Sequence, residues 1–504
     1  MELRLLASRG AFEKVRELPV VIQHTRNRAT LRRLESVYYD TAKQLLFRHG
    51  ISLRVRRNGR HFVQTLKLPP ADGRPLGRRQ RDVPVDSIVP DLARLPADEI
   101  GHPIMAQIKN TLVPVFTTKV RRYVQRLDFP DASADIVFDE GTIEAGTQQE
   151  AVFEIKLKLK SGNAGVLLDL GGQLLGAAPL QFSVCNTAER GYMLAFDLER
   201  SATKARLPDI AADEVVDNVI ARLMGSCWHH LVKNSEVAQE ETDPEGVHQM
   251  RVALRRLRTV CTMFQHYIPS PVFQAVSTEA KWVMQQLGRT RDWDVFAETA
   301  TRLATTIPEI DLSGLREVVE RQRQSNYGAV QAALADPRCS RFLLTLGHMI
   351  ERRGWRNEID SEALVVLSRP MLGLADKILA RLHRKALKRG VHFNRLDSAM
   401  QHRLRIDVKK LRYAAEFLLP LYAAHLPVKR YVKRLAGLQA ALGGACDIAS
   451  SRTLIDVIRR NDQPALALAA GVVTGWQARD QLVAAKALRK RWRRFKTAET
   501  FWNR

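Results

Sequence analysis

The chain contains the same basic helical pattern twice. Residues 248–258 read HQMRVALRRLR and residues 402–412 read HRLRIDVKKLR, so each His is followed by Arg or Lys at +3, +7, +8 and +10. Positions 0, +3, +7 and +10 fall within roughly an 80° arc of an α-helix. Each segment is therefore predicted to form a helix with one packed face and one positively charged face. The charged residues are His248, Arg251, Arg255, Arg256 and Arg258 in the first copy, and His402, Arg405, Lys409, Lys410 and Arg412 in the second.

These charged faces carry almost no compensating acid. A typical surface helix places acids three or four residues from its basic residues. Residues 248–258 contain no acid, and residues 402–412 contain only Asp407, which points elsewhere. The pattern predicts binding of a multiply charged anion. The alternative is a pair of ordinary solvated faces, with His248 and His402 serving as caps or packing residues. The opposite side of the first copy is apolar, with Met250, Leu254, Leu257 and Cys261.

The two copies belong to a longer internal repeat. The segment DNVIARL at 217–223 is similar to DKILARL at 376–382, and a basic segment follows each of them. About 40 residues after each basic segment comes Leu-Gly, with an Asp four residues past the Gly. Ordered anchors at a nearly constant offset predict two helical bundles related by an approximate two-fold axis, so that the basic helices can face each other. These later anchors are Leu287, Gly288 and Asp292, and Leu442, Gly443 and Asp447.

Composition is consistent with a polyanionic partner. The chain has 504 residues, 45% of them hydrophobic, and a net charge of +25. Its length predicts about two to four domains with substantial cores. The excess of positive charge favours nucleic acid, anionic membrane or inorganic phosphate polymer, and does not choose among them.

No targeting or membrane-spanning segment is evident in the sequence. The five cysteines are scattered, without metal-ligand spacing, as is typical of reduced thiols in a cytosolic protein. The opening MELRLLASRG lacks the apolar core of a signal peptide. The most apolar stretch, 465–473, is far shorter than the roughly 20 residues that span a bilayer. We therefore expect a soluble cytoplasmic protein without membrane contact.

Residues 1–200 have the pattern of short β-strands separated by Gly, Pro, Asn and Asp turns. The segment FEIKLKLK at 153–160 alternates strictly between apolar and charged residues. Its charged face would be solvent-exposed in a surface sheet, or would line the lumen of a closed barrel. Short helices are expected at 31–34 and 164–175.

Residues 201–212 are polar, contain one Pro and lack periodicity, which predicts a linker. Helical periodicity dominates beyond it. The expected fold class is a multidomain α+β chain, in which an N-terminal antiparallel β-barrel precedes an all-α domain of two duplicated four-helix bundles. The expected domains are 1–200, the linker, and 213–500, with one repeat at about 213–300 and the other at about 370–460.

The helical part resembles the CHAD family, the conserved histidine α-helical domain. The resemblance rests on DPEGVHQMRVALRRLR, KWVMQQLGRTRDWDVF, HRLRIDVKKLRYAAEF and GLQAALGGACD, and covers roughly residues 213–500. It implies a basic central surface that binds inorganic polyphosphate, and association with polyphosphate granules. The residues implied for that surface are His248, Arg251, Arg255, Arg258, Lys281, His402, Arg405, Lys409, Arg412 and Lys433, with Arg289 and Arg434 as further candidates.

Residues 1–200 resemble the CYTH family, whose fold is a triphosphate tunnel of eight antiparallel strands. The resemblance rests on YYDTAKQLLFRHGISLRVRRNGR, QTLKLP, FTTKVRR, FDEGTIEAG and FEIKLKLKSG. It implies basic side chains that grip a triphosphate, and carboxylates that hold a divalent metal, Mg or Mn, for catalysis. The implied basic set is Arg4, Arg54, Arg56, Lys67 and Arg122, and the implied catalytic and metal-binding set is Glu2, Asp139 and Glu154.

The chain departs from the CYTH pattern at several acidic positions. The family begins with Glu-x-Glu-x-Lys, of which Glu2 and Arg4 are present here. Its late strand carries Glu-x-Glu-x-Glu, whereas Lys156 and Lys158 take the second and third positions here. Hard divalent cations need oxygen ligands, and one like-charge contact at about 4 Å costs about 4 kcal/mol at an effective dielectric of about 20. We therefore expect the tunnel to bind anions well and to hydrolyse them poorly. Further departures are Gln80 in place of Glu, and Asn186-Thr187 in place of Ser-Lys.

Two alternatives to a polyphosphate-binding protein remain open. One is a metal-dependent inorganic triphosphatase that uses the CHAD-like part for docking. The other is a nucleic-acid binder, although no reader motif is present and specific nucleic-acid binding is not expected. The basic run 486–496, with Trp492 and Phe495, would suit base stacking, but a final amphipathic helix with a solvated basic face is favoured.

Asp292 and Asp294 are expected to orient arginines or cap helices rather than to act as acids. The oligomeric state is left open.

Overall fold

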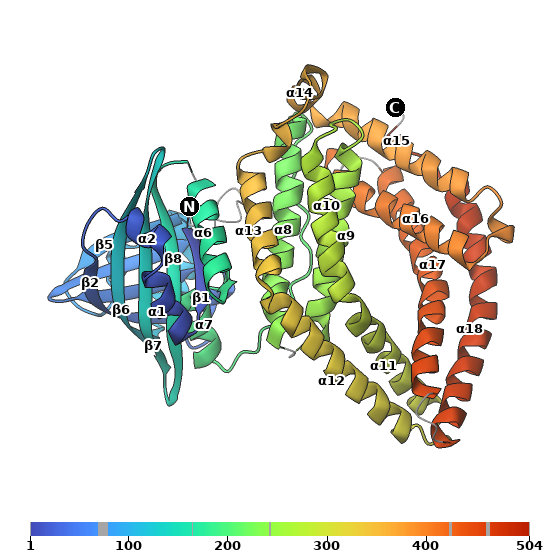
Figure 1. Cartoon of the computed structure of the whole chain (residues 1–504), viewed down its shortest axis with the longest axis horizontal. Helices are drawn as coiled ribbons and strands as arrows, with labels where there is room; N and C mark the ends of the chain where they lie inside the picture. Colours follow the sequence, from blue (N-terminus) through green and yellow to red (C-terminus); the bar gives the residue numbers. More distant parts are fainter. Residues whose placement is uncertain are drawn as a thin grey trace. The chain divides into compact units, whose positions relative to one another are not determined.

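The computed structural model describes residues 2–68, 79–163, 165–240, 243–422, 426–459 and 464–502. The chain divides into two compact units. The first contains Met1–Ala202 and Leu334–Arg352, and the second contains Thr203–Ala333 and Arg353–Arg504. A β-sheet with short helices forms the first unit and long helices form the second, which confirms the expected α+β class (Figure 1).

The first unit is built on one antiparallel sheet of nine strands, in the order β5-β4-β3-β2-β6-β7-β8-β1-β9. Five of the eight neighbouring pairs in the described sheet are also consecutive in sequence, and two-residue turns join β3 to β4, β6 to β7 and β7 to β8. The long strands β6, β7 and β8 form the middle of the sheet and supply most of its hydrogen-bonded register. The strands are β1 Glu2–Ala7, β2 Thr30–Thr41, β3 Ser52–Asn58, β4 His61–Leu68, β5 Arg79–Val85, β6 Leu112–Phe129, β7 Ala132–Ala145, β8 Gln148–Gly162 and β9 Leu180–Phe182.

The expected eight-stranded barrel is not closed. Within the described residues the sheet ends at β5 and β9, and no pairing joins these two strands. Helix α13 (Pro337–Glu351) contacts β9, so a helix covers this edge where a closed barrel would have another strand. The sheet is nevertheless strongly curved. Lys67 on β4 and Glu2 on β1 lie near opposite edges, yet each influences the pKa of the other.

The expected helix at residues 31–34 is wrong, because this segment lies within β2. Strand β2 pairs with β3 on one side and with β6 on the other, and these long-range bonds override the local helical pattern. The other expected helix is present as α6 (Gly165–Ala177), while Ala164 lies outside the described residues.

Short helices pack on the faces and edge of the sheet. Helix α1 contacts β1 and β8, α6 contacts β1, β8 and β9, and α7 contacts β6, β7 and β8. A capping box in which Asn186 and Glu189 satisfy each other's backbone N–H groups starts α7. The helices before α6 are α1 Arg9–Arg16, α2 Pro19–Gln23, α3 Leu45–Arg48, α4 Ala97–Ile100 and α5 His102–Ile108, and the helix after it is α7 Thr187–Ala195.

Helix α13 belongs to the sheet unit, although in sequence it lies between the two helical repeats. It begins after the N-cap Asp336, and it packs against α6 and β9. Leu344 lies directly over Gly171 of α6, where an added Cβ would be 3.4 Å from its Cδ1. The chain therefore returns to the first unit long after the polar segment 201–212.

The second unit contains two sets of four sequential helices. In both sets, helices that follow each other in sequence pack together. The two sets also meet: α9 contacts its counterpart α16, and α11 contacts α17. No helix in the described part of the chain is long and apolar enough to cross a membrane. The first set is α8 Val216–Glu240, α9 Pro244–Phe264, α10 Pro271–Gln286 and α11 Gly288–Thr306; α12 Ser313–Ala335 and α14 Ser361–Ser368 flank α13; the second set is α15 Met371–Arg389, α16 Ser398–Leu418, α17 Leu426–Arg459 and α18 Pro464–Lys496.

Candidate functional site

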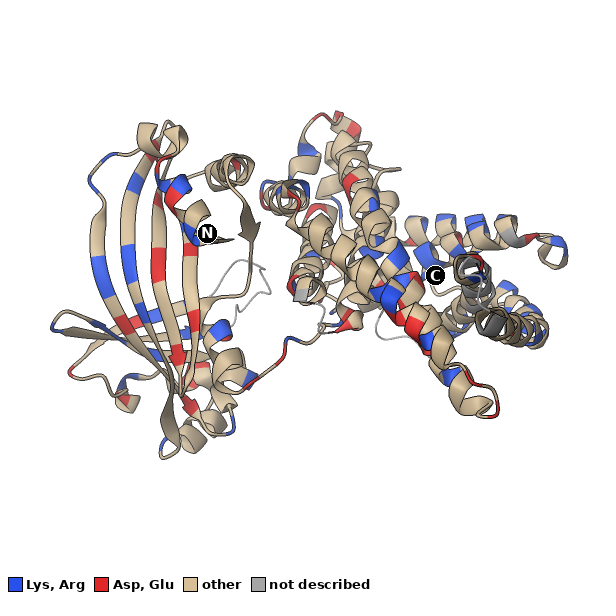
Figure 2. Cartoon of the chain, turned by 60° about the horizontal axis from the view of Figure 1, so that its bottom comes forward, with Lys and Arg blue, Asp and Glu red and all other residues tan. Residues whose placement is uncertain are grey.

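Basic and acidic residues lie close together along neighbouring strands of the sheet (Figure 2). The strand register places Arg4 opposite Lys156, Glu2 opposite Lys158, and Asp139 opposite both Arg122 and Glu154. Residues directly opposite each other in a sheet project from the same face. Strands β3 and β4 add Arg54, Arg56 and Lys67 to this face. The face therefore brings together the whole set implied by the CYTH resemblance: Glu2, Arg4, Arg54, Arg56, Lys67, Arg122, Asp139 and Glu154.

Lys156 lies between the two most buried carboxylates of this face. Its Nζ is 2.6 Å from Oδ2 of Asp139 and 2.7 Å from Oε2 of Glu154. Glu154 is 0% exposed, Asp139 2% and Lys156 6%. The solvent-facing alternative for the alternating segment 153–160 is therefore wrong at Glu154 and Lys156. Buried charges are tolerated when they are paired, and these three groups form one ionic unit.

Arginines and a hydroxyl complete the neutralisation of these carboxylates. Arg122 donates two hydrogen bonds to Asp139, at 2.6 and 2.7 Å. Glu154 accepts from Arg190 Nη1 at 3.2 Å and from the Thr187 hydroxyl at 3.1 Å, and it lies 3.6 Å from Arg4 Nε. Burial raises the pKa of both carboxyls, but the neighbouring cations, Lys156 first, outweigh burial and leave each pKa below its usual value. Both carboxylates stay ionised at neutral pH.

The acidic residues do not fit a divalent metal. Glu2 is paired with Arg4 at 3.0 Å and with Lys158 at 3.3 Å, and the other two implied ligands share the Lys156 ammonium. No group of three His, Cys, Asp or Glu side chains within the described residues is placed to hold a metal ion. Magnesium and manganese need several oxygen ligands at once. The expected Mg or Mn site of Glu2, Asp139 and Glu154 is therefore not assembled by these side chains, and we derive no catalytic step for them.

The remaining cations of the face point to anion binding. Arg54 donates to the Tyr38 hydroxyl at 3.1 Å, and Arg56 donates to Ser36 Oγ at 3.3 Å. Burial, followed by repulsion from Arg54, lowers the pKa of Arg56 to about 9 and that of Lys67 to about 6. Within the described residues, the ion pairs of this face do not include Arg54, Arg56 or Lys67. A bound anion would offset the cost of desolvating these cations and would reduce their mutual repulsion.

Sequence reasoning missed two contributors to this face, Arg190 and Tyr38. Arg190 lies on α7, which the capping box of Asn186 and Glu189 positions so that Arg190 also pairs with Glu150 at 2.6 Å. The Asn-x-x-Glu spacing of that box is a signal that the sequence did contain. Nothing in the sequence indicates the role of Tyr38, because its ring is placed by stacking on Phe116, which lies on another strand.

In the helical unit, α9 presents the first basic face. The Asp243 side chain caps the helix, and Leu254 and Leu257 are buried on its apolar side. Arg256 does not join the basic face, because it is buried and lies over the ring of Phe417 of α16 at 4.3 Å. It packs where the two repeats meet. The half-buried residues of the basic face are His248, Arg251, Arg255 and Arg258.

Each repeat places an arginine beside the glycine of its Leu-Gly anchor. A Cβ added at Gly288 would be 3.3 Å from Arg251 Nη1, and one added at Gly443 would be 3.8 Å from Arg405 Nη2. The repeated glycine therefore leaves room for a guanidinium in both copies. Arg251 Nε and Nη1 are buried and have no hydrogen-bond acceptor within the described residues. Burial, followed by repulsion from Arg255, lowers the pKa of Arg251 to about 10. Buried donors of this kind call for an anionic acceptor.

Helix α16 presents the second basic face. Asp407 is buried and pairs with Lys385 at 3.5 Å and with Arg389, so it does not neutralise this face. Arg412 of this helix pairs with Glu416 at 2.8 Å. The pKa of His402 is lowered by partial burial and then by Arg405. The basic face of α16 consists of His402, which is exposed, and of Arg405, Lys409 and Arg412, which are half-buried.

The other predicted residues have separate surroundings. Lys281 on α10 and Lys433 on α17 are exposed, as is Arg289 on α11, while Arg434 is half-buried. Asp294 is buried and accepts a hydrogen bond from Arg323 at 3.0 Å, so it orients an arginine. The side chain of Asp447 lies outside the described residues.

Base stacking by the C-terminal aromatics is not supported by their burial. Trp492 is 5% exposed and Phe495 is 0% exposed. Trp492 stacks on Phe393 at 4.9 Å, and Phe495 packs against His383. Both rings therefore serve the core of the second helical set and are not available to a nucleic acid.

Comparison with known proteins identifies both units. The CHAD domain family model matches residues 222–456, and the CYTH domain family model matches residues 1–192. The CHAD domain from the plant Ricinus communis, known from a crystal structure, is 31% identical, and the alignment covers 58% of this chain and 97% of that one, with a TM-score of 0.49. The chain therefore contains a CYTH domain followed by a CHAD domain.

Two curated relatives share different parts of the chain. The inorganic triphosphatase of Haemophilus influenzae is 29% identical over 166 residues, which cover 32% of this chain and 46% of the relative. The chain thus spans less than half the length of that relative. An uncharacterized protein of Mycobacterium tuberculosis is 28% identical over 416 residues, covering 76% of this chain and 75% of the relative.

Proposed function

We propose that this protein binds inorganic polyphosphate on the basic faces of α9 and α16. The observation that carries this proposal is a pair of buried guanidinium nitrogens of Arg251, Nε and Nη1, which lack a hydrogen-bond acceptor within the described residues. Arg251 lies beside Gly288, and Arg405 lies beside Gly443 in the equivalent position. The contact between α9 and α16 places these faces on adjoining helices, where one extended anion can reach both. Clustered cations bind a phosphate polymer by releasing its counterions. Binding of long chains would also direct the protein to polyphosphate granules.

We further infer that the charged face of the CYTH sheet binds a triphosphate-type anion and hydrolyses it poorly. Arg54 and Arg56 supply positive charge, and Lys67 becomes an ammonium when the anion binds. The name of the Haemophilus influenzae relative supports inorganic triphosphate as the anion class. Poor hydrolysis follows from Lys156, whose ammonium takes the carboxylate oxygens that a divalent cation would need.

Charge reversal tests the polyphosphate site. We expect Arg251→Glu with Arg405→Glu to weaken binding of long-chain polyphosphate by about 100-fold or more, because repulsion replaces attraction at two central positions. Helical content by circular dichroism should stay unchanged. Lys486→Glu with Lys490→Glu, on exposed positions of α18, makes the same change in net charge and is the matched control. Equal losses in the two variants would refute a localised site.

Competition separates polyphosphate from nucleic acid. Long-chain polyphosphate should displace a single-stranded DNA oligonucleotide of matched charge at a much lower concentration than the reverse. Equal displacement in both directions would instead favour a general polyanion binder.

The principal alternative is a metal-dependent inorganic triphosphatase, which the name of the Haemophilus influenzae relative favours. A phosphate-release assay with tripolyphosphate, with and without Mg²⁺ or Mn²⁺, decides between the two. We expect no metal-dependent rate above buffer for the natural chain, and a measurable rate for Lys156→Glu with Lys158→Glu. A metal-dependent rate in the natural chain would establish the alternative and remove the inference of poor hydrolysis.

A further inference from the structure

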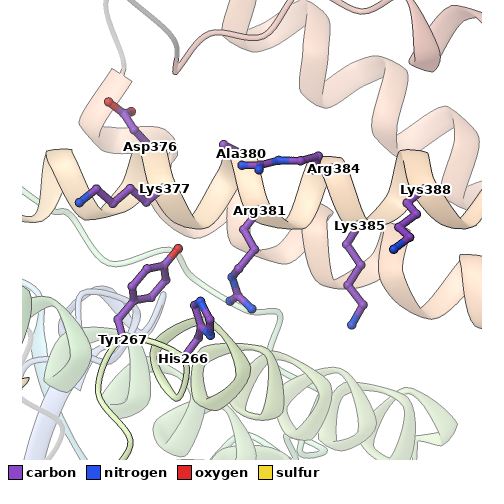
Figure 3. A pocket seen from close by; sticks show the side chains of 9 residues that line it. All are labelled: His266, Tyr267, Asp376, Lys377, Ala380, Arg381, Arg384, Lys385 and Lys388. Atoms are coloured by element: carbon purple, nitrogen blue, oxygen red, sulfur yellow. The ribbon is translucent and has the colours of Figure 1, made fainter.

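A basic pocket lies where α15 passes the end of α9, outside the two repeated basic segments (Figure 3). Its volume is about 690 Å³. His266 and Tyr267, which follow α9, form one side, and α15 forms the other. Five of its nine lining residues are cations spaced along one face of α15, at i, i+4, i+7, i+8 and i+11. They are Lys377, Arg381, Arg384, Lys385 and Lys388.

Arg381 is held in place at the back of this pocket. Its Nη2 donates to the carbonyl oxygens of Thr262 and Met263 at 3.2 and 3.4 Å, and these belong to the last turn of α9. Its guanidinium also lies 5.6 Å from the centre of the Tyr267 ring. Its Nε is buried and has no acceptor within the described residues. The pocket thus contains a preorganised guanidinium with an unused donor.

The acids near the pocket are already engaged. Asp376, the one carboxylate that lines it, accepts a hydrogen bond from the Tyr422 hydroxyl. Asp407 is shared by Lys385 and Arg389. Lys410 of α16 lies close by, and its pKa is lowered by burial and then by repulsion from Lys385, with Arg258 and Arg381 adding to the effect. Asp407 opposes this effect, and the lowered pKa shows that the cations around Lys410, together with burial, outweigh it.

In the equivalent place of the first repeat, the charged side chains are paired within the protein. Asp217, the counterpart of Asp376, is buried and bound by Trp355 and Arg356, at 2.7 and 2.6 Å. Arg222, the counterpart of Arg381, is paired with Glu214 at 2.7 Å. Asn218 stands where the second repeat has Lys377. The open, cationic pocket is therefore a property of the second repeat and not of the duplication.

We propose that this α15 pocket is an additional phosphate-binding subsite, which takes a further stretch of the inorganic polyphosphate chain bound along α9 and α16. The proposal rests on the proposed polyphosphate binding and extends it. Unpaired donors and clustered ammonium groups favour a chain of phosphoryl groups, because such an anion offers several charged oxygens to cations spaced along one helix face. Arg258 and Lys410 connect the pocket to the basic face of α9.

The test uses the full chain and long-chain polyphosphate in two measurements. In the first, lysine acetylation is followed by mass spectrometry: polyphosphate should protect Lys377, Lys385 and Lys388, and leave Lys486 and Lys490 of α18 reactive. In the second, Lys377→Gln, Arg384→Gln and Lys388→Gln are combined, which leaves the Arg381 contacts to α9 intact. We expect this variant to bind about tenfold more weakly and with a smaller salt dependence. Lys486→Gln, Arg489→Gln and Lys490→Gln, at exposed positions of α18, form the matched control.

The possible results separate the two proposals. The subsite would be overturned if the natural chain binds polyphosphate, the pocket lysines are not protected, and the variant binds as its control does. That result would not affect the proposed binding faces of α9 and α16. Absence of polyphosphate binding by the natural chain would overturn both.

Discussion

At the scale of single residues, Lys156 decides the chemistry of the CYTH face. A divalent cation can leave and return, whereas an ammonium between Asp139 and Glu154 is covalently part of the strand. Arg122 pairs with Asp139 and Arg190 with Glu154, so both carboxylates are neutralised within the protein. The face is therefore assembled before any ligand arrives, and the charge left over for a ligand is positive.

Removal of the Lys156 charge should destabilise the first unit. Lys156→Met leaves buried carboxylates partly uncompensated, and we expect a loss of about 3–5 kcal/mol in the free energy of unfolding. Because the folded-state pKa values of Asp139 and Glu154 are lowered, their pairing stabilises the natural chain above about pH 4, and this contribution is lost as the pH falls further. Urea unfolding followed by far-ultraviolet circular dichroism measures the loss of stability. Lys156→Arg is the control, and an unchanged Lys156→Met stability would show that the ionic unit is not structural.

Lys67 should make triphosphate binding depend on pH. Its pKa of about 6 means that it is mostly neutral at pH 8 in the ligand-free protein, whereas a bound phosphate favours the ammonium. Binding therefore takes up a proton, and affinity should fall by up to about tenfold per pH unit above pH 6. Titration calorimetry in buffers of different ionisation enthalpy counts this proton. Lys67→Met should bind more weakly at pH 6 and lose most of the pH dependence between 6 and 8; an unaltered profile would contradict the assignment.

At the scale of elements, the position of α13 is the feature with the clearest consequence. Its apolar side, including Leu343 and Leu344, is buried against the sheet unit, although the sequences before and after it belong to the helical unit. The edge strand β9 is short and contacts this helix. Helix α13 therefore acts as part of the CYTH core in this chain.

Disruption of α13 should loosen the sheet unit selectively. Leu344→Asp buries an unpaired charge over Gly171, and we expect a cost of about 3 kcal/mol or more. Hydrogen exchange should rise in α6 and β9, with little change in α9 or α16. Arg341→Ala, at an exposed position of the same helix, is the control. Faster exchange confined to α9 or α16 would show that α13 supports the helical unit instead.

At the scale of the whole molecule, the excess of cations governs how the chain meets a polyanion. Net charge is +25, and the basic faces of α9 and α16 are contributed by equivalent helices that contact each other. In the proposed binding mode, each phosphate contact made by these faces would release a counterion. The affinity for polyphosphate should therefore depend on the salt concentration as strongly as on the contacts.

The logarithm of the polyphosphate binding constant should fall linearly with the logarithm of the salt concentration. For about six to ten contacts, we expect a loss of about 10³–10⁵ between 50 and 200 mM salt. Arg251→Glu with Arg405→Glu should lower the slope as well as the affinity. Fluorescence anisotropy with labelled polyphosphate gives both quantities, and a slope near zero would contradict electrostatic binding.

Much of the fold followed from local pattern. Periods of 3.6 and 2 separated the helical unit from the sheet, and the spacing of His248, Arg251 and Gly288 repeated closely enough to reveal the duplication. Closure of the barrel and the helix at residues 31–34 were predicted wrongly. Each depends on partners far away in sequence: the helix that contacts β9, and the strands on both sides of β2.

The amino-acid sequence by itself determined where charge and apolar residues fall along each helix and strand, because side-chain periodicity is a local property of the backbone. Tertiary structure alone decided which charges meet. Lys156 lies between two carboxylates, Arg251 lies beside Gly288, and the cations of α15 open into a pocket at the end of α9. Electrostatic energy depends on distance and burial, and both are set only when strands and helices remote in sequence pack together.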